Sequence, residues 1–425
     1  MLMAPAWHGW VNDQIEQLQA QDLLRSLKPL IPGHSAVEVL VAPDVLHAWT
    51  EECDPQSCAG LPTEGSSLRL FSSNDYMGFS AHPAVRRAAA DAALRHGMGP
   101  RSSAVVGGYT FLHEELEQRL ARLKNTEECL LFPTGFAANM AVVSALCSSP
   151  DVTIFSDELN HASIVDGARL ATRQQGRLKV YRHNDMQHLE DLLAECPQGH
   201  RKLVITDSLF SMDGDFADLA ALVQLRRKYA FLLALDDAHA TFVCGKRGGG
   251  AAEMFGVEEE VDIHIGTLSK AVGVHGGFVA CRAAVKSFLL NRGRSYIFST
   301  SLTVPVVAAA LAAIKLNEQE PERRKHLWRL VERLAEGLGM PAESPIVPLI
   351  VGSEAAALSA SAQLLQRGLY VPAIRPPTVA PGTSRLRISL SAAHSMQDVD
   401  DLIDTLRECS IIPVKGEPQQ GLAKL

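Results

Sequence analysis

The stretch FLLALDDAHATFVCG at residues 231–245, with VDIHIGTLSKAVGVHGGFVAC at residues 261–281, decides the fold. The apolar run that opens the first stretch predicts a buried strand ending directly before Asp236 and Asp237. The second stretch holds another apolar run, which ends in Gly-Thr-Leu-Ser followed by Lys270. Because ligands bind beyond the carboxyl ends of parallel strands, we expect these polar side chains to meet at one edge of a sheet.

A carboxylate at 236–237, the imidazole of His239 and the amine of Lys270 together have the chemistry of a pyridoxal phosphate site. A lysine forms a Schiff base with this cofactor, and a carboxylate keeps the pyridine nitrogen protonated so that the ring accepts electrons. Taken alone, a salt-bridged aspartate and an ordinary surface lysine explain the pattern about equally well, because short motifs give many false positives.

The composition is that of a globular chain with more than one domain. The chain has 425 residues, 47% of them hydrophobic and 21% charged; this length predicts two domains. Its net charge of −8 argues against nucleic acid and against anionic membrane surfaces as partners. The longest nearly apolar run, at 304–314, is too short to span a bilayer and predicts a buried helix.

Cysteine spacing predicts neither a metal site nor a disulfide framework. The eight cysteines are scattered without metal-ligand spacing, at positions 53, 58, 129, 147, 196, 244, 281 and 409. Cys129 and Cys281 lie inside apolar strand patterns, so we interpret them as core thiols in a reducing compartment.

Short apolar runs alternate with helical periods between residues 68 and 299. Strands are predicted at 129–132, 152–155, 178–181, 203–206, 231–235, 263–266 and 277–281, with helices that include 186–194 and 219–229. This alternation predicts an α/β fold with a large, mostly parallel seven-stranded sheet covered on both faces.

After residue 300 the pattern changes to a smaller C-terminal α+β domain. It comprises helices at 304–317 and 321–338 and then a set of elements at 346–351, 355–367, 370–374, 386–390 and 396–409. An N-terminal helix is predicted at 10–27 and a loop or insertion at 48–67. The predicted divisions are an N-terminal segment (1–67), a large cofactor-binding domain (68–303), a small domain (304–410) and a tail (411–425).

Other strand ends carry residues suited to the same ligand. The small residues at 133–139 open a helix whose amide groups would suit a phosphate, although a plain strand-to-helix turn explains them as well. His161 would suit stacking on an aromatic ring, although a lone histidine is more often structural. Hydroxyl and acidic residues end a further strand at 206–215. Strand ends in one region thus carry residues suited to a phosphate, a ring and a Schiff base in a consistent order. Independent structural explanations for all of them are improbable.

With these motifs the chain resembles the α-oxoamine synthases. These enzymes use pyridoxal 5'-phosphate as cofactor and have the aspartate-aminotransferase fold (fold type I). The resemblance covers roughly residues 10–410. The matching stretches are NDYMG (74–78), TGFAAN (134–139), NHASI (160–164), FSMDGD (210–215), DDAH (236–239), TLSK (267–270) and IRPPT (374–378).

The resemblance implies roles for the cofactor site. Lys270 would be the Schiff-base lysine and the acid/base at the substrate α-carbon. Asp236 would pair with the pyridinium nitrogen, His239 would bond the ring oxygen, and His161 would stack on the ring and lie against the substrate. The remaining cofactor contacts, at the phosphate or beside it, would come from Gly135, Phe136, Ser211 and Thr267.

Within the family the chain is most similar to the eukaryotic enzymes of biotin synthesis that condense L-alanine with pimeloyl-CoA. Arg25 and Thr378 align with substrate contacts there, and Arg375 is a candidate for the amino-acid carboxylate because guanidinium binds carboxylates bidentately. Departures at 99–101, at Ala240 and in the 48–67 segment leave the details of acyl-chain recognition open. The family also implies a homodimer, whose 292–300 segment would reach the neighbouring subunit's phosphate.

Three alternatives remain open. Two are sibling enzymes, 5-aminolevulinate synthase and serine palmitoyltransferase; the third is a catalytically inactive regulatory subunit, which the intact motif ending at Lys270 argues against. Residues 1–24 contain no Lys or Arg, unlike a mitochondrial presequence. The final tripeptide Ala423-Lys424-Leu425 is close to the Ser-Lys-Leu address, so we expect capture by a peroxisomal import receptor, with the cytosol as the alternative location.

Overall fold

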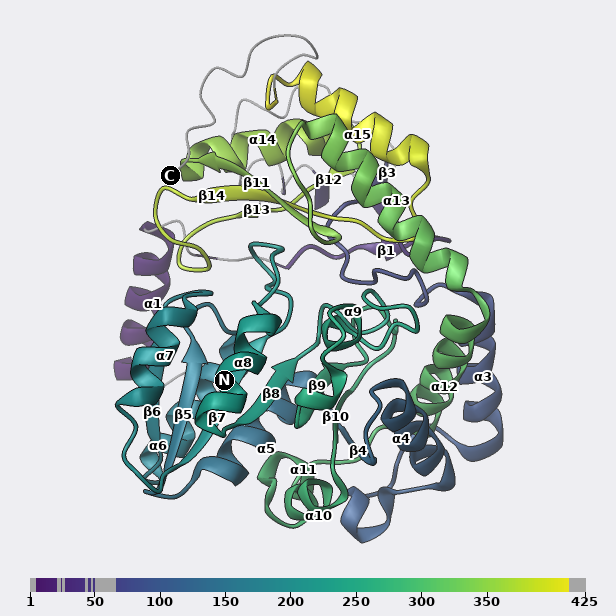
Figure 1. Ribbon diagram of the computed structural model, residues 1–425. Helices are drawn as coiled ribbons and strands as arrows, with labels where there is room; N and C mark the ends of the chain where they lie inside the picture. The colour runs from purple at the N-terminus through teal and green to yellow at the C-terminus, as the bar shows by residue number, and fades with distance from the viewer. Residues whose placement is uncertain are drawn as a thin grey trace.

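The computed structural model describes residues 5–20, 24, 27–42, 45–46, 49 and 66–412. A large α/β part with a central sheet lies below a smaller part built of strands and long helices (Figure 1). The α/β, fold type I architecture predicted from the sequence is confirmed.

The central sheet has seven strands in the order β4-β10-β9-β8-β7-β5-β6. These are β4 (Glu128–Phe132), β5 (Val152–Asp157), β6 (Arg177–Tyr181), β7 (Arg201–Asp207), β8 (Leu232–Asp236), β9 (Ile263–Thr267) and β10 (Gly277–Cys281). Neighbouring strands are parallel except around β10, which is antiparallel to both β9 and β4. The short connection between β9 and β10 explains this exception, because a parallel pair needs a crossover of a dozen or more residues.

Helices cover both faces of this sheet. Helices α5 (Gly135–Cys147), α6 (Ala162–Arg173), α10 (Ala283–Arg292) and α11 (Arg294–Ile297) enclose one apolar cluster, and α4 (Phe111–Leu123), α7 (Met186–Ala194) and α8 (Leu219–Tyr229) contribute to the other. Successive residues of a strand alternate between them: Leu203 and Ile205 belong to the first cluster and Val204 to the second.

The smaller part contains a three-stranded sheet of β11 (Ile346–Gly352), β14 (Ser384–Ser389) and β13 (Ala373–Ile374). Its helices are α13 (Pro321–Leu338), α14 (Glu354–Gln366) and α15 (Met396–Glu408). Helix α12 (Val304–Gln319), the predicted buried helix, packs instead on α3 (Pro83–His96) and α4 of the large part. The packing therefore changes from one part to the other between α12 and α13.

The prediction of one continuous strand at 370–374 is wrong. The structure has two short strands there, β12 (Leu369–Tyr370) and β13, and they belong to different sheets. Pro372 lies between them, and because proline lacks an amide hydrogen it cannot continue a ladder.

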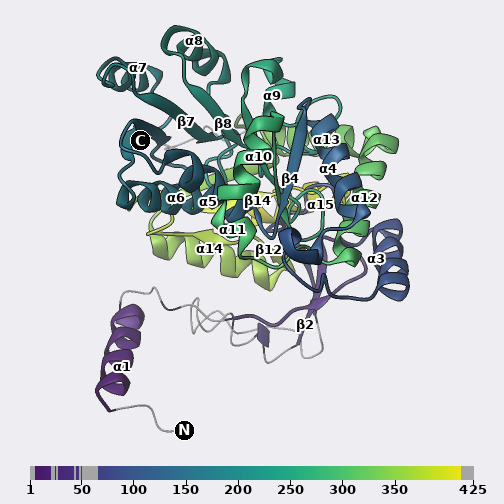
Figure 2. The ribbon, with the colours of Figure 1, turned by 90° about the horizontal axis from the view of Figure 1, so that it is seen from below.

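The N-terminal segment differs most from expectation. Helix α1 spans Pro5–Ala20 and stands apart from the rest (Figure 2), whereas the predicted residues 24 and 27 are not helical. Three strands were not predicted: β1 (Ile31–Pro32), β2 (Glu38–Val41) and β3 (Ser66–Leu70), which continue the sheet of β12. Most of the 48–67 segment lies outside the described residues. Among those described, no helix is long and apolar enough to cross a bilayer.

Candidate active site

A cavity of about 220 Å³ lies where β7, β8 and β9 end and α5 and α6 begin. Seven of the eight predicted cofactor contacts line it: Gly135, Phe136, His161, Asp236, His239, Thr267 and Lys270. Parallel strands end at the same edge, so residues up to 135 positions apart converge here, as the sequence predicted.

Lys270 begins a chain of hydrogen bonds that leads away from the cavity. Its Nζ lies 2.7 Å from His239 Nε2, and Nδ1 of the same ring lies 2.7 Å from the Tyr76 hydroxyl. That hydroxyl donates to Asn74 Oδ1, which only accepts, so His239 donates from Nδ1 and accepts from Lys270 at Nε2. Burial lowers the pKa of His239 well below its ordinary value, consistent with this neutral ring.

Lys270 is poised to lose its proton near neutral pH. Burial lowers the pKa of its ammonium group to about 8, although the charges of Asp236 and Asp207 oppose the shift. A buried lysine with such a pKa can act as a nucleophile and as a base.

Asp236 lines the same cavity, and both of its carboxylate oxygens accept hydrogen bonds. Its Oδ1 accepts from the backbone of Ala238 at 2.9 Å, and its Oδ2 accepts from Asn139 Nδ2 at 2.6 Å. Asn139 also donates to Ser163 Oγ, which lies 2.7 Å from His161 Nδ1. His161 accepts there from the Ser163 amide as well, so this network fixes the ring at the start of α6.

The start of α5 and the turn after β9 form the third wall. Thr134 caps α5 by accepting from the amide of Ala137, and the amide groups of Gly135 and Phe136 have no acceptor within the helix. A Cβ at Gly135 would lie 3.1 Å from Thr267 Cβ, so a larger residue would require Thr267 to shift, and glycine allows this close approach without strain. The hydroxyls of Thr267 and Ser269 lie 2.7 Å apart beside it.

These walls fit a flat, anionic cofactor with an aldehyde. Helix α5 offers amide groups and the positive end of its dipole to a phosphate, while Lys270 offers an amine to a carbonyl. Two buried oxygens at the cavity, Oδ1 of Asp207 and Oδ1 of Asn139, have no hydrogen-bond partner among the residues that the structure describes. Unpartnered buried oxygens are costly, so a ligand that supplies donors would stabilise the site.

Four predicted site residues are not in this lining. Ser211 lies in the loop after β7, where its carbonyl accepts from Arg387. Arg375 and Thr378 follow β13 in the smaller part, and Thr378 is exposed. Arg25 lies outside the described residues. Their ligand contacts stay predictions.

Several cavity residues had no predicted role. Asn139, Ser163, Asp207 and Ser269 line the cavity although only their surrounding motifs were recognised. The helical period could have indicated Asn139, which follows Gly135 by one turn of α5.

The comparisons identify the family. A family model described as aminotransferase class I and II matches residues 68–406. The chain belongs to that family. It is 45% identical to an 8-amino-7-oxononanoate synthase of Arabidopsis thaliana, with 95% of each chain covered. A protein of the same name from Anaeromyxobacter dehalogenans is 43% identical, with 95% and 96% covered.

Solved structures agree with this assignment. A structure of SPT with pyridoxal phosphate aligns with a TM-score of 0.84 at 26% identity, covering 96% of this chain and 99% of that one. An 8-amino-7-oxononanoate synthase of Francisella tularensis aligns with a TM-score of 0.69 at 25% identity, covering 81% and 98%. The resemblance to α-oxoamine synthases and the cofactor are thereby confirmed: the chain is a pyridoxal-phosphate-dependent enzyme.

Proposed function

We propose that the enzyme condenses L-alanine with pimeloyl-CoA, giving 8-amino-7-oxononanoate, CoA and CO2. The observation that carries the proposal is the half-buried Lys270, with a lowered pKa, in the same cavity as Asp236. The choice of substrates is supported by relatives named 8-amino-7-oxononanoate synthase, which are 40–45% identical over most of the chain.

Each wall of the cavity has a part in holding the cofactor. When bound, pyridoxal phosphate supplies an electron sink for the bond broken at the amino-acid α-carbon. Asp236, fixed by Asn139, would keep the pyridine nitrogen protonated. The first amides of α5 with Thr267 would hold the phosphate, His161 would cover the ring face, and His239 would bond the ring oxygen.

Lys270 would perform the proton transfers. With a pKa of about 8, a substantial fraction of its Nζ is neutral at physiological pH, so it can take the α-proton of alanine and later return a proton to the product. His239 accepts from this amine in the free enzyme and so orients it. Once alanine has attacked the thioester carbonyl of pimeloyl-CoA, CoA leaves and the resulting β-keto acid loses CO2.

The substrate carboxylate has two candidate partners. Arg375 was predicted from its motif. Arg387 is the second candidate, because its buried guanidinium donates to Asn74 Oδ1, which also accepts from the Tyr76 hydroxyl beside His239. Its Nε is fixed by the Ser211 carbonyl and one Nη by Ser389 Oγ. We propose that Arg387 binds the carboxylate and that Ser211 acts by orienting it.

Association into a homodimer is a further part of the proposal. Helix α11 packs on α5, and Thr300 pairs with Ser103 beside two exposed apolar residues, Val106 and Phe298. These lie 79% and 70% exposed, and a second copy of the chain would cover them. Sedimentation should give a dimer, and an active monomer at high dilution would refute it.

A substrate panel tests the reaction. Alanine, glycine and serine are each combined with pimeloyl-, succinyl- and palmitoyl-CoA, and CoA release is measured as free thiol. Alanine with pimeloyl-CoA should exceed every other pair in kcat/KM by about tenfold or more. Preference for serine with palmitoyl-CoA would assign the enzyme instead to the serine palmitoyltransferase type, which the higher TM-scores of those structures favour. No turnover by the cofactor-loaded protein would favour a regulatory subunit.

A further inference from the structure

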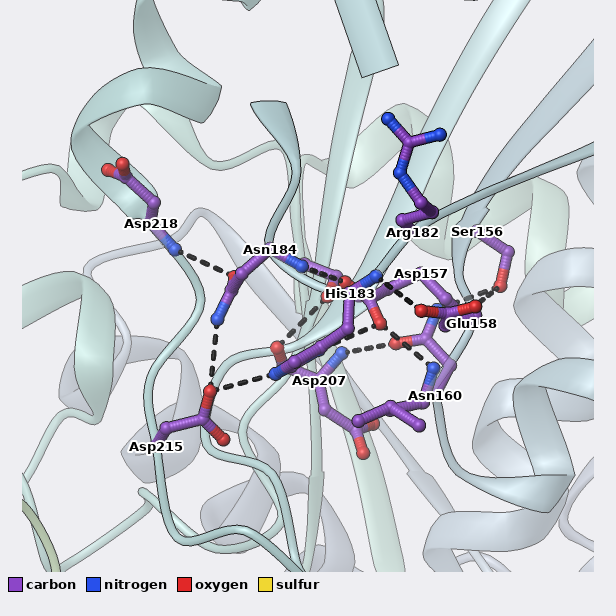
Figure 3. A network of polar contacts seen from close by, with 12 residues as sticks. Ser156, Asp157, Glu158, Asn160, Arg182, His183, Asn184, Asp207, Asp215 and Asp218 are labelled. Atoms are coloured by element: carbon purple, nitrogen blue, oxygen red, sulfur yellow. Dashed lines mark hydrogen bonds and ion pairs between the residues drawn. The ribbon is translucent and has the colours of Figure 1, made fainter. Parts of the chain in front are cut away.

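His183 lies just beyond β6 with a carboxylate at each ring nitrogen (Figure 3). Nδ1 lies 3.1 Å from Asp157 Oδ1, and Nε2 lies 2.8 Å from Asp215 Oδ2. Asp157 ends β5 and is almost fully buried, while Asp215 belongs to the loop after β7. Sequence reasoning gave this histidine no role.

The geometry makes the ring a cation. An ionised carboxylate only accepts hydrogen bonds, so both ring nitrogens must donate, and only an imidazolium does that. Burial lowers the pKa of His183, but hydrogen bonds and charge from Asp157 and Asp215 outweigh burial and raise it to about 10. Among the described residues no further side chain bonds to the ring: Arg182 pairs with Asp185, Glu158 accepts from the backbone amide of His183, and Phe210 meets the imidazole edge-on at 4.4 Å.

Asp157 connects this cation to the turn that leads into His161. The Asp157 carboxylate also accepts from the amides of Leu159 and Asn184. The side chain of Asn160 then bridges to β7: it donates to the carbonyl of Ile205 and accepts from the amide of Asp207. The segment carrying His161 is thus bonded to the strand whose last residue lines the cavity.

Asp215 connects the same cation to the 208–216 loop. Its Oδ2 accepts from Asn184 Nδ2 at 3.1 Å, and its carbonyl accepts from the amide of Phe210 across the loop. The loop starts directly after Asp207 and carries Ser211, whose carbonyl fixes Arg387. One imidazolium therefore joins the two segments that carry His161 and the Arg387 contact.

We propose that His183 is a positioning residue. As a permanently protonated imidazolium it cross-links the segment that carries His161 to the 208–216 loop, and it thereby sets the affinity of the cavity for the cofactor. The inference rests on the proposed cofactor contact of His161. It does not depend on which amino acid or thioester reacts, so its tests use the cofactor-loaded protein without substrates.

The protonation state is measured first. In protein with ¹⁵N-labelled histidine rings, the His183 signals are assigned from their loss in His183→Gln. At pH 8 both ring nitrogens should carry protons. A ring with a single proton at that pH would overturn the proposal.

Cofactor binding is measured next. His183→Gln should weaken pyridoxal phosphate binding roughly tenfold, because it loses two charge-assisted hydrogen bonds. The control is His200→Gln directly before β7, where the ring bonds Thr153 Oγ1 of β5, and it should stay within about twofold of wild type. Unchanged affinity in His183→Gln would overturn the proposal.

Asp215→Asn separates a charged link from simple packing. The ring keeps Asp157 but loses one anion, so the pKa of His183 should fall towards its ordinary value. Cofactor affinity relative to wild type should then decline as pH rises from 7 to 9. A ratio that stays constant with pH would show that the charge has no part in positioning.

Discussion

Two adjacent aspartates at the end of β8 each lie in the surroundings of a different lysine. Asp236 lines the cavity that holds Lys270, whereas Asp237 is bonded to Lys124 on the other side of the strand end at 2.8 Å. Successive residues of a strand point to opposite faces. A shift of one residue along the chain therefore moves the carboxylate from the reactive site to the core. Identical residue types thus have different chemistry because their surroundings differ.

The second pair is enclosed and fully partnered. Lys124 and Asp237 have no solvent exposure, and Lys124 also donates to Thr241 Oγ1 and the Gly249 carbonyl. Burial would raise the pKa of Asp237, but the charge of Lys124 holds it well below its usual range. Lys270 has no carboxylate bonded to its Nζ among the described residues, and it faces open space.

The largest expected effect is that of Lys270→Ala. Turnover should fall by about 10⁴-fold or more, because this amine is proposed both to attach the cofactor and to move protons. Circular dichroism should show an unchanged fold. Visible absorbance from covalently held cofactor in the variant would contradict the assignment.

Lys124→Met should leave the turnover of the folded protein intact and should lower its stability. The uncompensated charge of Asp237 should cost about 3–5 kcal/mol of unfolding free energy, measured with denaturant. As a control, adding Asp237→Leu should recover most of this loss, because an apolar pair often replaces a buried ion pair without penalty. If the folded single variant lost turnover as Lys270→Ala does, the contrast between the lysines would fail.

Asp236→Asn should reduce turnover by roughly 10²- to 10³-fold, because an amide cannot stabilise a protonated pyridine nitrogen. Cofactor attachment should persist, as Lys270 is unchanged. Near-normal exchange of the alanine α-proton, followed by NMR in deuterated water, would refute the role.

The smallest effect is a pH dependence. The rate of cofactor attachment should rise about tenfold per pH unit and level off near pH 8, because only the unprotonated Lys270 amine attacks. Stopped-flow absorbance between pH 6.5 and 9.5 measures this. A rate that rises steadily to pH 9.5 would mean that burial does not lower the pKa.

Much of the large part could be predicted because its strands are continuous apolar runs and its helices have clear periods. Helices α7, α8 and α13 and strand β10 begin and end at the predicted residues. Strands β1 and β2 were missed because they are short, and β2 gains its order from pairing with β3 in a distant part of the chain.

The site shows the same division between local and distant information. Lys270, Asp236 and His161 follow apolar runs, so the sequence placed them at one edge. Asn139 and Arg387 act through contacts with residues 97 and 176 positions away, which no local pattern contains. The choice between Asp236 and Asp237 was predicted from family resemblance, and the structure supplies the physical reason.

Reduction of the cofactor-loaded enzyme with borohydride tests the central claim most directly. The treatment fixes the cofactor to its lysine, and peptide mass spectrometry then identifies the residue. The account predicts one pyridoxyl group per chain on the peptide containing Lys270 and none on that containing Lys124. A label on another lysine, or none on Lys270, would contradict it.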